Sequence, residues 1–166
     1  MTKPKKYISE DDALERMRKY CAYQERCHFE VKKKLYDLGM FRDTQDEILS
    51  TLISEDYLNE GRYAQSFTSG KMRIKKWSKA KIRLELRKRF ISDYLVRKAL
   101  AEIDEYQYQD NIDALLRKKY ATLVNESSLT RRNKLVSYML RKGYSLSEIK
   151  PPLNILSNEF EDKHDN

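Results

Sequence analysis

A dense run of basic residues is the feature of this 166-residue sequence that most directly suggests a binding chemistry. The segment from Lys71 to Arg89 reads KMRIKKWSKAKIRLELRKR and contains one acid, Glu85. Ten basic residues against one acid give +9, whereas the whole chain has a formal net charge of +8. The ten are Lys71, Arg73, Lys75, Lys76, Lys79, Lys81, Arg83, Arg87, Lys88 and Arg89. Because like charges at this density repel one another, the pattern favours a polyanionic partner over a merely solvated helix face.

These ten residues are predicted to form a partner- and DNA-binding surface. Lys and Arg side chains neutralise phosphates, and Arg guanidinium groups also bind protein carboxylates through two parallel hydrogen bonds. Smaller basic clusters at 32–34, 117–119 and 131–134 suggest a basic edge that recurs along the chain. A solvated face explains each smaller cluster equally well.

Metal binding and catalysis have little support in the sequence. A structural zinc site needs four ligands in close pairs, but Cys21 and Cys27 are six residues apart, with His28 beside them and His164 far away. We expect Cys21 to be a core residue and the protein to hold no metal or other cofactor. The sequence has no nucleophile elbow and no Gly-rich phosphate loop, which predicts that it is not an enzyme.

The composition predicts an α-helical protein of the cytoplasm. Only 4 Gly and 3 Pro argue against an all-β fold, while 12 Tyr and 5 Phe argue against full disorder. Two Cys are too few for a disulfide framework, which favours a reducing compartment. The start MTKPKKYISEDD lacks the apolar region of a signal peptide, and no apolar run reaches about 18 residues. We therefore expect no membrane partner.

Apolar residues recur at helical spacing along most of the chain. The spacing predicts helices over about 10–24 and 28–38, followed by a third helix that opens at a capping box, Thr44–Glu47. A fourth helix is predicted to reach Trp77, and Ser78 is predicted to cap a fifth.

The second half of the chain is predicted to contain four more helices and a polar hinge. Ser92 or Asp93 caps a sixth helix, and the tyrosines and carboxylates of 104–110 form a polar hinge. Two longer helices then lead to a capping box at Ser145–Glu148. Pro151–Pro152 are expected to break or kink the last helix about one turn after its start, because proline lacks the N–H group and clashes with the preceding turn. We expect a short turn there, followed by a second helical piece that contains Leu153 and Leu156.

A repeated string indicates three modules. LYDLGM, LRKRFI and MLRKGY align so that Gly39, Phe90 and Gly143 occupy the same position, 51 and 53 residues apart. We predict an all-α fold of three tandem three-helix repeat modules that share apolar surface in an elongated, curved body. The expected parts are a basic N-terminal tail at 1–9, modules at 10–58, 59–105 and 106–157, and an acidic C-terminal tail at 158–166.

Two strings in the middle of the chain carry a family resemblance. DYLNEGRYAQSF at 56–67 and KKWSKAKIRLELRKRFIS at 75–92, together with the triple repeat, resemble the RecX family over roughly residues 12–150. The sequence departs from the family pattern at Ser78 and Phe90, where Gly is usual. The residues predicted to form the junction of modules one and two are Tyr57, Leu58, Arg62, Tyr63 and Trp77.

The resemblance implies a non-enzymatic, all-α regulator of the RecA recombinase. Proteins of this family lie in the groove of the RecA–DNA filament and restrain strand exchange, ATP turnover and coprotease activity in recombination and the SOS response. The partners it implies are the RecA filament and single- or double-stranded DNA, and we expect a monomer. Two other functions stay open, a helix-turn-helix-like DNA-binding protein without a recombinase partner and a helical adaptor that binds only proteins.

The sequence allows alternative roles for two residues. Trp77 could stack on a base, although its place at the end of an apolar stripe favours the module junction. Arg62 could form a surface ion pair with Glu60 or organise the junction, and the family pattern favours the junction.

Overall fold

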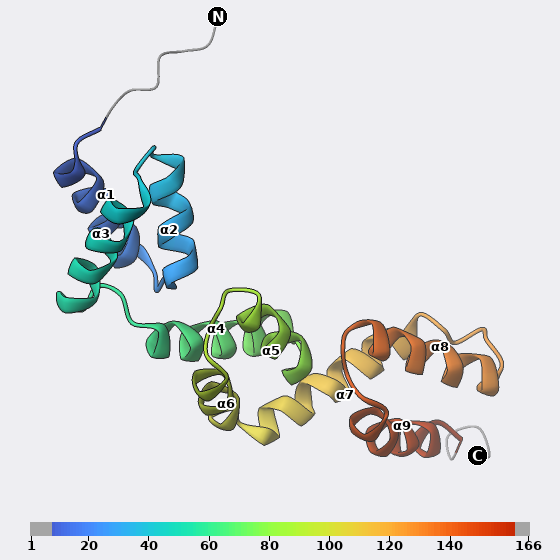
Figure 1. The fold of residues 1–166 in the computed structure, drawn as a ribbon. Coiled ribbons are helices and arrows are strands. Elements are labelled where there is room, and N and C mark those ends of the chain that lie inside the picture. Colours follow the sequence, from blue (N-terminus) through green and yellow to red (C-terminus); the bar gives the residue numbers. More distant parts are fainter. Residues whose placement is uncertain (1–7, 162–166) are drawn as a thin grey trace, which may run out of the picture. The chain divides into compact units, whose positions relative to one another are not determined.

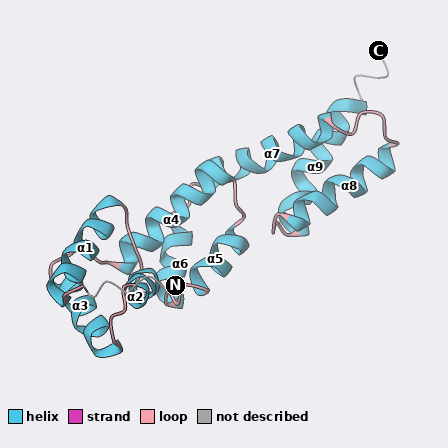
Figure 2. Cartoon of the chain, turned by 90° about the horizontal axis from the view of Figure 1, so that it is seen from above, coloured by secondary structure: helices cyan, strands magenta, loops and turns pink. Residues whose placement is uncertain are grey.

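The computed structural model describes residues 8–161, and all regular structure in that stretch is α-helical (Figures 1 and 2). The helices are α1 (Glu10–Tyr23), α2 (His28–Asp37), α3 (Arg42–Ser54), α4 (Glu60–Lys75), α5 (Lys79–Arg87), α6 (Asp93–Ala101), α7 (Glu105–Ala121), α8 (Ser128–Arg141) and α9 (Leu146–Glu161). The all-α prediction is confirmed. Each of these helices is too short or too polar to cross a bilayer.

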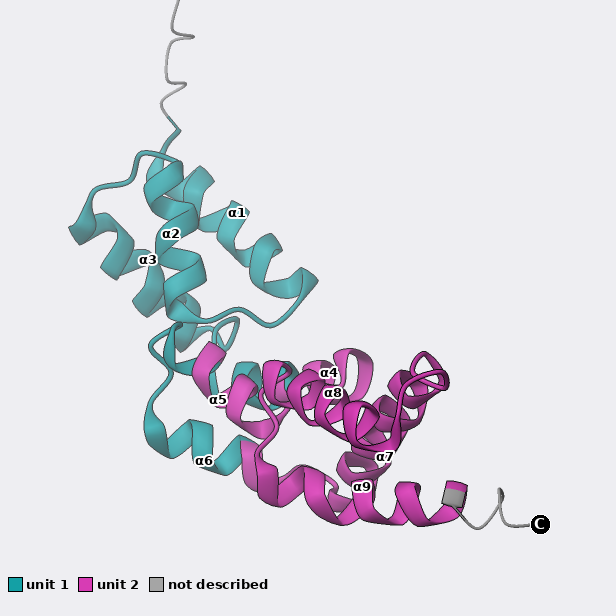
Figure 3. Cartoon of the chain, turned by 90° about the vertical axis from the view of Figure 1, so that its right-hand side faces the viewer, with its two compact units in different colours: residues 1–67, 86–99 teal, residues 68–85, 100–166 magenta. Residues whose placement is uncertain are grey.

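The chain divides into two compact units, with boundaries inside α4, α5 and α6 (Figure 3). Unit 1 contains residues 1–67 and 86–99, and unit 2 contains residues 68–85 and 100–166. The predicted tails lie largely outside the described residues, at 1–7 and 162–166. Residues 158–161, expected in the acidic tail, belong to α9. The three-module boundaries stay a prediction.

The core of unit 1 forms where α1 and α2 both pack against α3. Ala13, Met17 and Cys21 follow one another at a spacing of four residues on α1, and each is at most 6% exposed. They meet the fully buried Val31 and Leu35 of α2 in one apolar cluster. The prediction that Cys21 is a core residue is confirmed.

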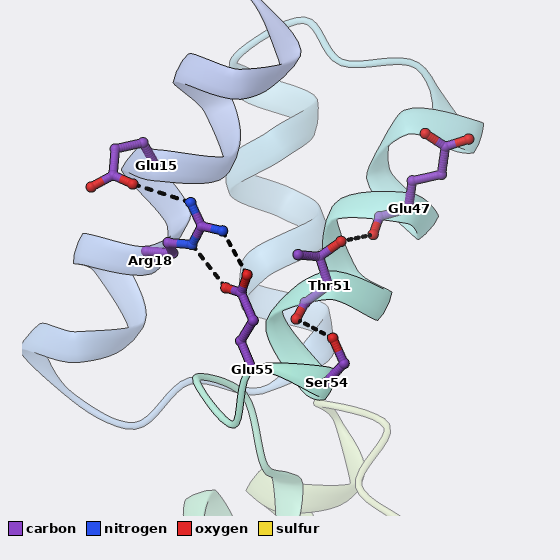
Figure 4. A network of polar contacts seen from close by, with 6 residues as sticks. All are labelled: Glu15, Arg18, Glu47, Thr51, Ser54 and Glu55. Atoms are coloured by element: carbon purple, nitrogen blue, oxygen red, sulfur yellow. Dashed lines mark hydrogen bonds and ion pairs between the residues drawn. The ribbon is translucent and has the colours of Figure 1, made fainter.

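A polar network on the surface of unit 1 ties α1 to the end of α3 (Figure 4). The Arg18 guanidinium donates from Nε to Glu55 Oε2 at 2.8 Å and from Nη2 to Glu55 Oε1 at 2.6 Å. A third bond, from Nη1, reaches Glu15 on the same helix at 3.3 Å. The hydrogen bonds with Arg18 lower the pKa of the Glu55 carboxyl and raise the pKa of Arg18. Because Glu55 is the C-cap of α3, the fork links the last turn of that helix to α1.

The core of unit 2 lies among α7, α8 and α9, each of which contacts the other two. Ile112 and Leu116 of α7, Met139 of α8, and Ile149 of α9 are fully buried. In α7 and α8, buried residues recur at intervals of three or four positions. This spacing is the pattern of a helix that buries one stripe of its surface.

The repeated string corresponds to one backbone motif in all three places. Gly39, Phe90 and Gly143 have φ values of 84°, 59° and 91°, the left-handed conformation that ends a helix in a Schellman motif. In each case the next amide donates to the carbonyl five residues earlier: Met40 to Leu35 at 3.0 Å, Ile91 to Leu86 at 3.2 Å, and Tyr144 to Met139 at 3.2 Å. The three strings therefore share their hydrogen bonds as well as their spacing.

Several predicted helix starts are confirmed by side-chain bonds. Ser78 Oγ accepts from the Lys81 amide at 3.1 Å, and Ser92 Oγ accepts from the Leu95 amide at 3.3 Å. At the last helix, the Glu148 carboxylate accepts from the amide of Ser145 at 2.7 Å, as a capping box requires.

Three boundaries differ from the predictions. Helix α3 begins at Arg42, so Thr44 lies inside it, and the Thr44 hydroxyl donates to Glu10 at 2.9 Å instead of capping. Helix α4 ends at Lys75 and leaves Trp77 outside. The expected hinge at 104–110 is instead the start of α7, because Asp104 caps that helix by accepting from the amides of the two residues after Glu105.

The prediction of a broken last helix is wrong. Helix α9 runs through Pro151 and Pro152 without interruption. Ile149, Leu153 and Leu156 lie on one face of it and are at most 2% exposed, so their burial stabilises the continuous helix. Pro151 and Ser147, whose carbonyl loses its hydrogen bond to the proline, are both exposed, so water is at hand for that carbonyl and the cost of a missing partner is lower.

The left-handed backbone at Phe90 predicts that Gly is more stable than Ala at this position, the opposite of their order inside a helix. Phe90→Gly and Phe90→Ala both remove the ring, which is 76% exposed and contacts Phe29 at a centroid distance of 5.5 Å. Only Gly adopts φ of 59° without strain, so the Gly variant should be more stable than the Ala variant by about 1 kcal/mol in urea unfolding. At exposed Tyr94 inside α6 the order should reverse, since helical backbone favours Ala. An Ala variant as stable as the Gly variant at position 90 would contradict the strain.

Candidate nucleic-acid interface

The predicted basic surface is divided between the two units. Lys71 to Arg83 contribute seven of its ten cations to unit 2, while Arg87, Lys88 and Arg89 belong to unit 1. A single surface made of all ten residues therefore stays a prediction. The structure instead separates the cations by what each one contacts within its own unit.

Three cations of unit 2 point to solvent. Arg73 and Lys75 lie in the last turn of α4, and Arg83 lies in the second turn of α5; all three are exposed. Among residues 8–161, none of the three has an ion pair or side-chain hydrogen bond. Positive charge in the last turn of a helix also complements the negative end of its dipole. These side chains can therefore bind a phosphate or a carboxylate without first breaking an internal contact.

Lys76 and Lys79 have structural contacts instead. Lys76 adopts φ of 51°, its Nζ donates to Asn111 Oδ1 at 3.3 Å, and its carbonyl accepts from the Tyr144 hydroxyl at 2.7 Å. Lys79 pairs through Nζ with Glu105, and its amide donates to the Tyr108 hydroxyl at 3.1 Å. Both residues hold the segment 76–79 against α7, so they are poor candidates for a purely external contact.

Two lysine ammonium groups lie beside the ring of Trp77. The Nζ atoms of Lys71 and Lys81 lie 5.0 and 4.4 Å from the centroid of its half-buried indole ring, within the range of a cation–π interaction. This contact fixes two charges beside each other on the surface of unit 2. The arrangement combines an aromatic ring with cations, as single-strand binding surfaces do.

The three cations of unit 1 differ among themselves. Arg87 Nε donates to Asp93 at 3.0 Å, and the Arg89 guanidinium lies 5.0 Å from the centroid of the Phe67 ring. Lys88 is exposed. The charge of Arg87 is thus partly compensated within the unit.

A buried polar network, which the sequence did not predict, anchors the basic segment of unit 2. Tyr108 is 1% exposed; its hydroxyl donates to Glu148 Oε1 at 2.7 Å and accepts from the amide of Lys79. Its ring contacts that of Tyr144 at a centroid distance of 5.9 Å. Close packing continues at Gly143, where a Cβ would lie 2.7 Å from Ser78 Oγ. Tyr108 lies four residues before Ile112 on the buried stripe of α7, a spacing that could have revealed it.

The predicted junction residues are divided between the two units. Leu58 and Tyr63 are buried in unit 1, where the Tyr63 hydroxyl donates to Glu30 at 3.2 Å, while Tyr57 is 36% exposed. Trp77 belongs to unit 2. A junction of all five residues therefore stays a prediction, and the other four belong to unit 1.

Arg62 has the contacts of a joint residue. Its Nε donates to Glu25 Oε1 at 2.9 Å, Nη1 donates to Asp56 Oδ1 at 2.6 Å, and Nη2 donates to the Asp56 carbonyl at 2.8 Å. These hydrogen bonds raise the pKa of Arg62. Glu60 instead accepts from the His28 amide at 3.2 Å. The geometry therefore favours the role in which Arg62 holds the α3–α4 connection. It does not favour the alternative in which Arg62 forms a surface ion pair with Glu60.

Comparison with known proteins places this architecture in a family. Residues 59–100 match the family model described as the second three-helix domain of RecX, and residues 105–151 match its third three-helix domain. Together they cover more than half of the chain. The chain belongs to the RecX family.

Individual RecX proteins show the same similarity. Regulatory protein RecX of Bacillus cytotoxicus is 27% identical over 143 residues, which cover 86% of this chain and 53% of the relative. That of Bacillus thuringiensis is 26% identical over 144 residues, covering 87% and 53%. The chain thus spans about half the length of these curated relatives. Their description as regulatory proteins agrees with the expectation of a non-enzymatic protein.

Solved RecX structures share the fold. The crystal structure of RecX from Lactobacillus salivarius matches with a TM-score of 0.79 at 26% identity, covering 89% of this chain and 96% of that one. A second crystal structure of regulatory protein RecX gives the same TM-score at 22% identity, which supports the fold alone.

The cysteines of this RecX-family chain are poor metal ligands. Cys21 and Cys27 are both buried. Burial raises the pKa of Cys21 to about 11 and also raises that of Cys27, so both thiols are protonated at neutral pH. Within residues 8–161, no three His, Cys, Asp or Glu side chains gather as a metal site would require.

The Tyr108 hydroxyl predicts a measurable loss of stability in Tyr108→Phe. The substitution keeps the ring but leaves the Glu148 carboxylate and the Lys79 amide without this partner. We expect a decrease of about 1–3 kcal/mol in the free energy of unfolding. The matched control is Tyr106→Phe, two residues away and 88% exposed, which should change stability by less than about 0.5 kcal/mol. Equal effects of the two substitutions would contradict an anchoring role.

Glu148 predicts a pH dependence. Burial alone would raise its pKa, but hydrogen bonds from the Ser145 amide, the Tyr108 hydroxyl and the Ser145 hydroxyl, with the charge of Lys79, lower it overall. A lowered pKa means that the unfolded state binds the proton more tightly, so this stabilisation exists above the ordinary Glu pKa and is lost as pH falls below it. Urea unfolding between about pH 7 and 3 should show a shallower loss of stability for Glu148→Gln than for the unmodified chain, with the difference arising below the ordinary Glu pKa. Parallel pH profiles would disprove the linkage.

Proposed function

We propose that this RecX-family chain binds the RecA recombinase or its DNA filament and restrains recombinase, ATPase and coprotease activity. It acts as a non-enzymatic, monomeric regulator in the bacterial cytoplasm, in recombination and the SOS response. The observation that carries the proposal is the match to two RecX domains. Helices α4 and α5 of the domain at 59–100 display exposed cations beside the strings most typical of the family.

Electrostatics supports a filament of protein and DNA as the partner. Arg73 and Arg83 can bind carboxylates of a protein through forked hydrogen bonds, and Lys75 can neutralise a phosphate. Individually exposed contacts of this kind are weak, but a filament offers the same contact many times. Contacts with phosphate would also make binding weaker as salt concentration rises.

The structure identifies which substitutions test binding rather than folding. Reversing the charge of Lys76 or Lys79 would break their bonds to Asn111 and Glu105 and damage unit 2. Reversal at Arg73, Lys75 and Arg83 breaks no contact of this kind. The informative variant is therefore Arg73→Glu/Lys75→Glu/Arg83→Glu.

The proposal predicts inhibition of ATP turnover by preformed RecA filaments on single-stranded DNA. The unmodified chain should inhibit at or below an equimolar ratio to RecA, and the triple variant should need at least about ten-fold more protein, since three contacts are lost. If they contact phosphate, the salt slope of binding should fall by up to about 0.7 per contact on single strands.

A matched control is available on the other helices. Arg16→Glu/Lys19→Glu/Arg97→Glu makes the same change in net charge at three exposed positions of α1 and α6. This control should inhibit as the unmodified chain does. Absence of inhibition by the unmodified chain at every ratio up to equimolar would refute the proposed function. Selective binding of one duplex sequence, measured without RecA, would instead favour a helix-turn-helix-like DNA-binding protein.

A further inference from the structure

A second basic surface lies on the third three-helix domain, and none of the residues that line it belongs to the segment 71–89. A groove of about 550 Å³ runs between α8 and the end of α7. Lys119 and Leu123 line it from the α7 side. Residues of α8 line the other side: Thr130, Asn133, Lys134, Ser137 and Arg141.

The α8 side of the groove presents a hydrogen-bond donor at every turn. Thr130, Lys134, Ser137 and Arg141 recur at intervals of four, three and four residues, so they share one face of the helix. Successive donors are therefore about 5.4 Å apart along the axis. Hydroxyl, ammonium and guanidinium groups in a row suit an extended chain of anions better than a single small anion.

The groove has an excess of positive charge. Lys134 pairs with Glu126, which compensates one cation. Lys119 and Lys142 flank the Tyr138 ring, with Nζ atoms 5.4 and 5.0 Å from its centroid. The ring holds these two ammonium groups without neutralising them. Lys119 and Arg141 line the groove, and neither has an ion pair within residues 8–161, so the groove itself holds two uncompensated positive charges.

Arg131, from one of the basic clusters seen in the sequence, is not part of this surface. Its guanidinium donates to the carbonyls of Leu123, Val124 and Glu126 and to the Tyr120 hydroxyl, at 2.6 to 3.1 Å. It therefore fixes the α7–α8 connection that forms one end of the groove. The cations that remain available for binding differ from Arg131 in the contacts that they make in the structure. The spacing of basic residues in the sequence does not reveal this difference.

We infer that the α7–α8 groove binds the phosphodiester backbone of a nucleic acid. A protein surface is less suitable, because protein interfaces depend on apolar or aromatic anchors. The only apolar lining residue, Leu123, is 7% exposed and offers no such anchor. A polyanionic backbone needs cations and neutral donors alone, and these are what the groove presents. The inference goes beyond the proposed function, because it gives the chain a second nucleic-acid contact that does not use residues 71–89.

The test measures binding of the full chain to a fluorescein-labelled oligo-dT by fluorescence anisotropy between about 50 and 200 mM salt. The variant Lys119→Gln/Arg141→Gln removes two positive charges from the groove. We expect several-fold weaker binding and a salt slope smaller by up to about 1.4, since each single-strand phosphate contact contributes about 0.7. The matched control, Lys118→Gln/Lys150→Gln, removes two exposed charges from the same unit outside the groove and should leave binding and slope unchanged.

Thermal unfolding of both variants confirms that they fold, and Lys119→Arg/Arg141→Lys should retain the slope because it keeps the charges. An unchanged slope in the groove variant overturns the inference, as does an equal loss in the control. Intact oligo-dT binding with lost inhibition of RecA would identify an acidic protein as the occupant and also overturn it. These outcomes are separate from the proposed function, which fails only when the unmodified chain does not inhibit RecA.

Discussion

The left-handed residue that ends the second helix of each repeat is the constraint on which the rest of the structure depends. At Gly39, Phe90 and Gly143 the chain leaves a helix through the same pair of backbone hydrogen bonds. The residue that follows has an apolar side chain, which packs against the helix that has just ended. Helix-to-helix packing around a small core requires this sharp exit, because each module is too small to bury a longer loop. Phe90 adopts this conformation even though it carries a Cβ, which shows how strongly the packing imposes it.

Electrostatics acts on this scaffold in two different ways. Some cations are consumed by the fold: Lys79 binds Glu105, and Arg131 binds the carbonyls of a helix connection. Others, such as Arg73 and Arg141, remain at the surface. Because a charge that already has a partner has little to offer a ligand, only the second group can produce salt-dependent binding. Net charge alone does not separate these groups, and a simple count of basic residues overstates the binding surface.

Buried polar contacts give the scaffold its specificity. Tyr108 and Asn111 are each 1% exposed, and their side chains bond to segments more than 25 residues away in sequence. Asn111 Nδ2 donates at 3.0 Å to the Met72 carbonyl near the end of α4, which also accepts from the Lys76 amide at 3.1 Å. Such bonds are costly to leave unmade in a low-dielectric interior, so they fix the basic segment of unit 2 against α7.

The sequence by itself determined the all-α fold, the three equivalent helix ends and the family, because these depend on local spacing and on short strings of residues. It also located the excess charge. Only the tertiary structure decided that α9 continues through Pro151 and that the stretch at 104–110 is helix rather than hinge. It also decided which lysines have internal partners. These outcomes depend on contacts between residues far apart in sequence, where burial and hydrogen bonding outweigh local preference, and no local pattern records which distant group will be the neighbour.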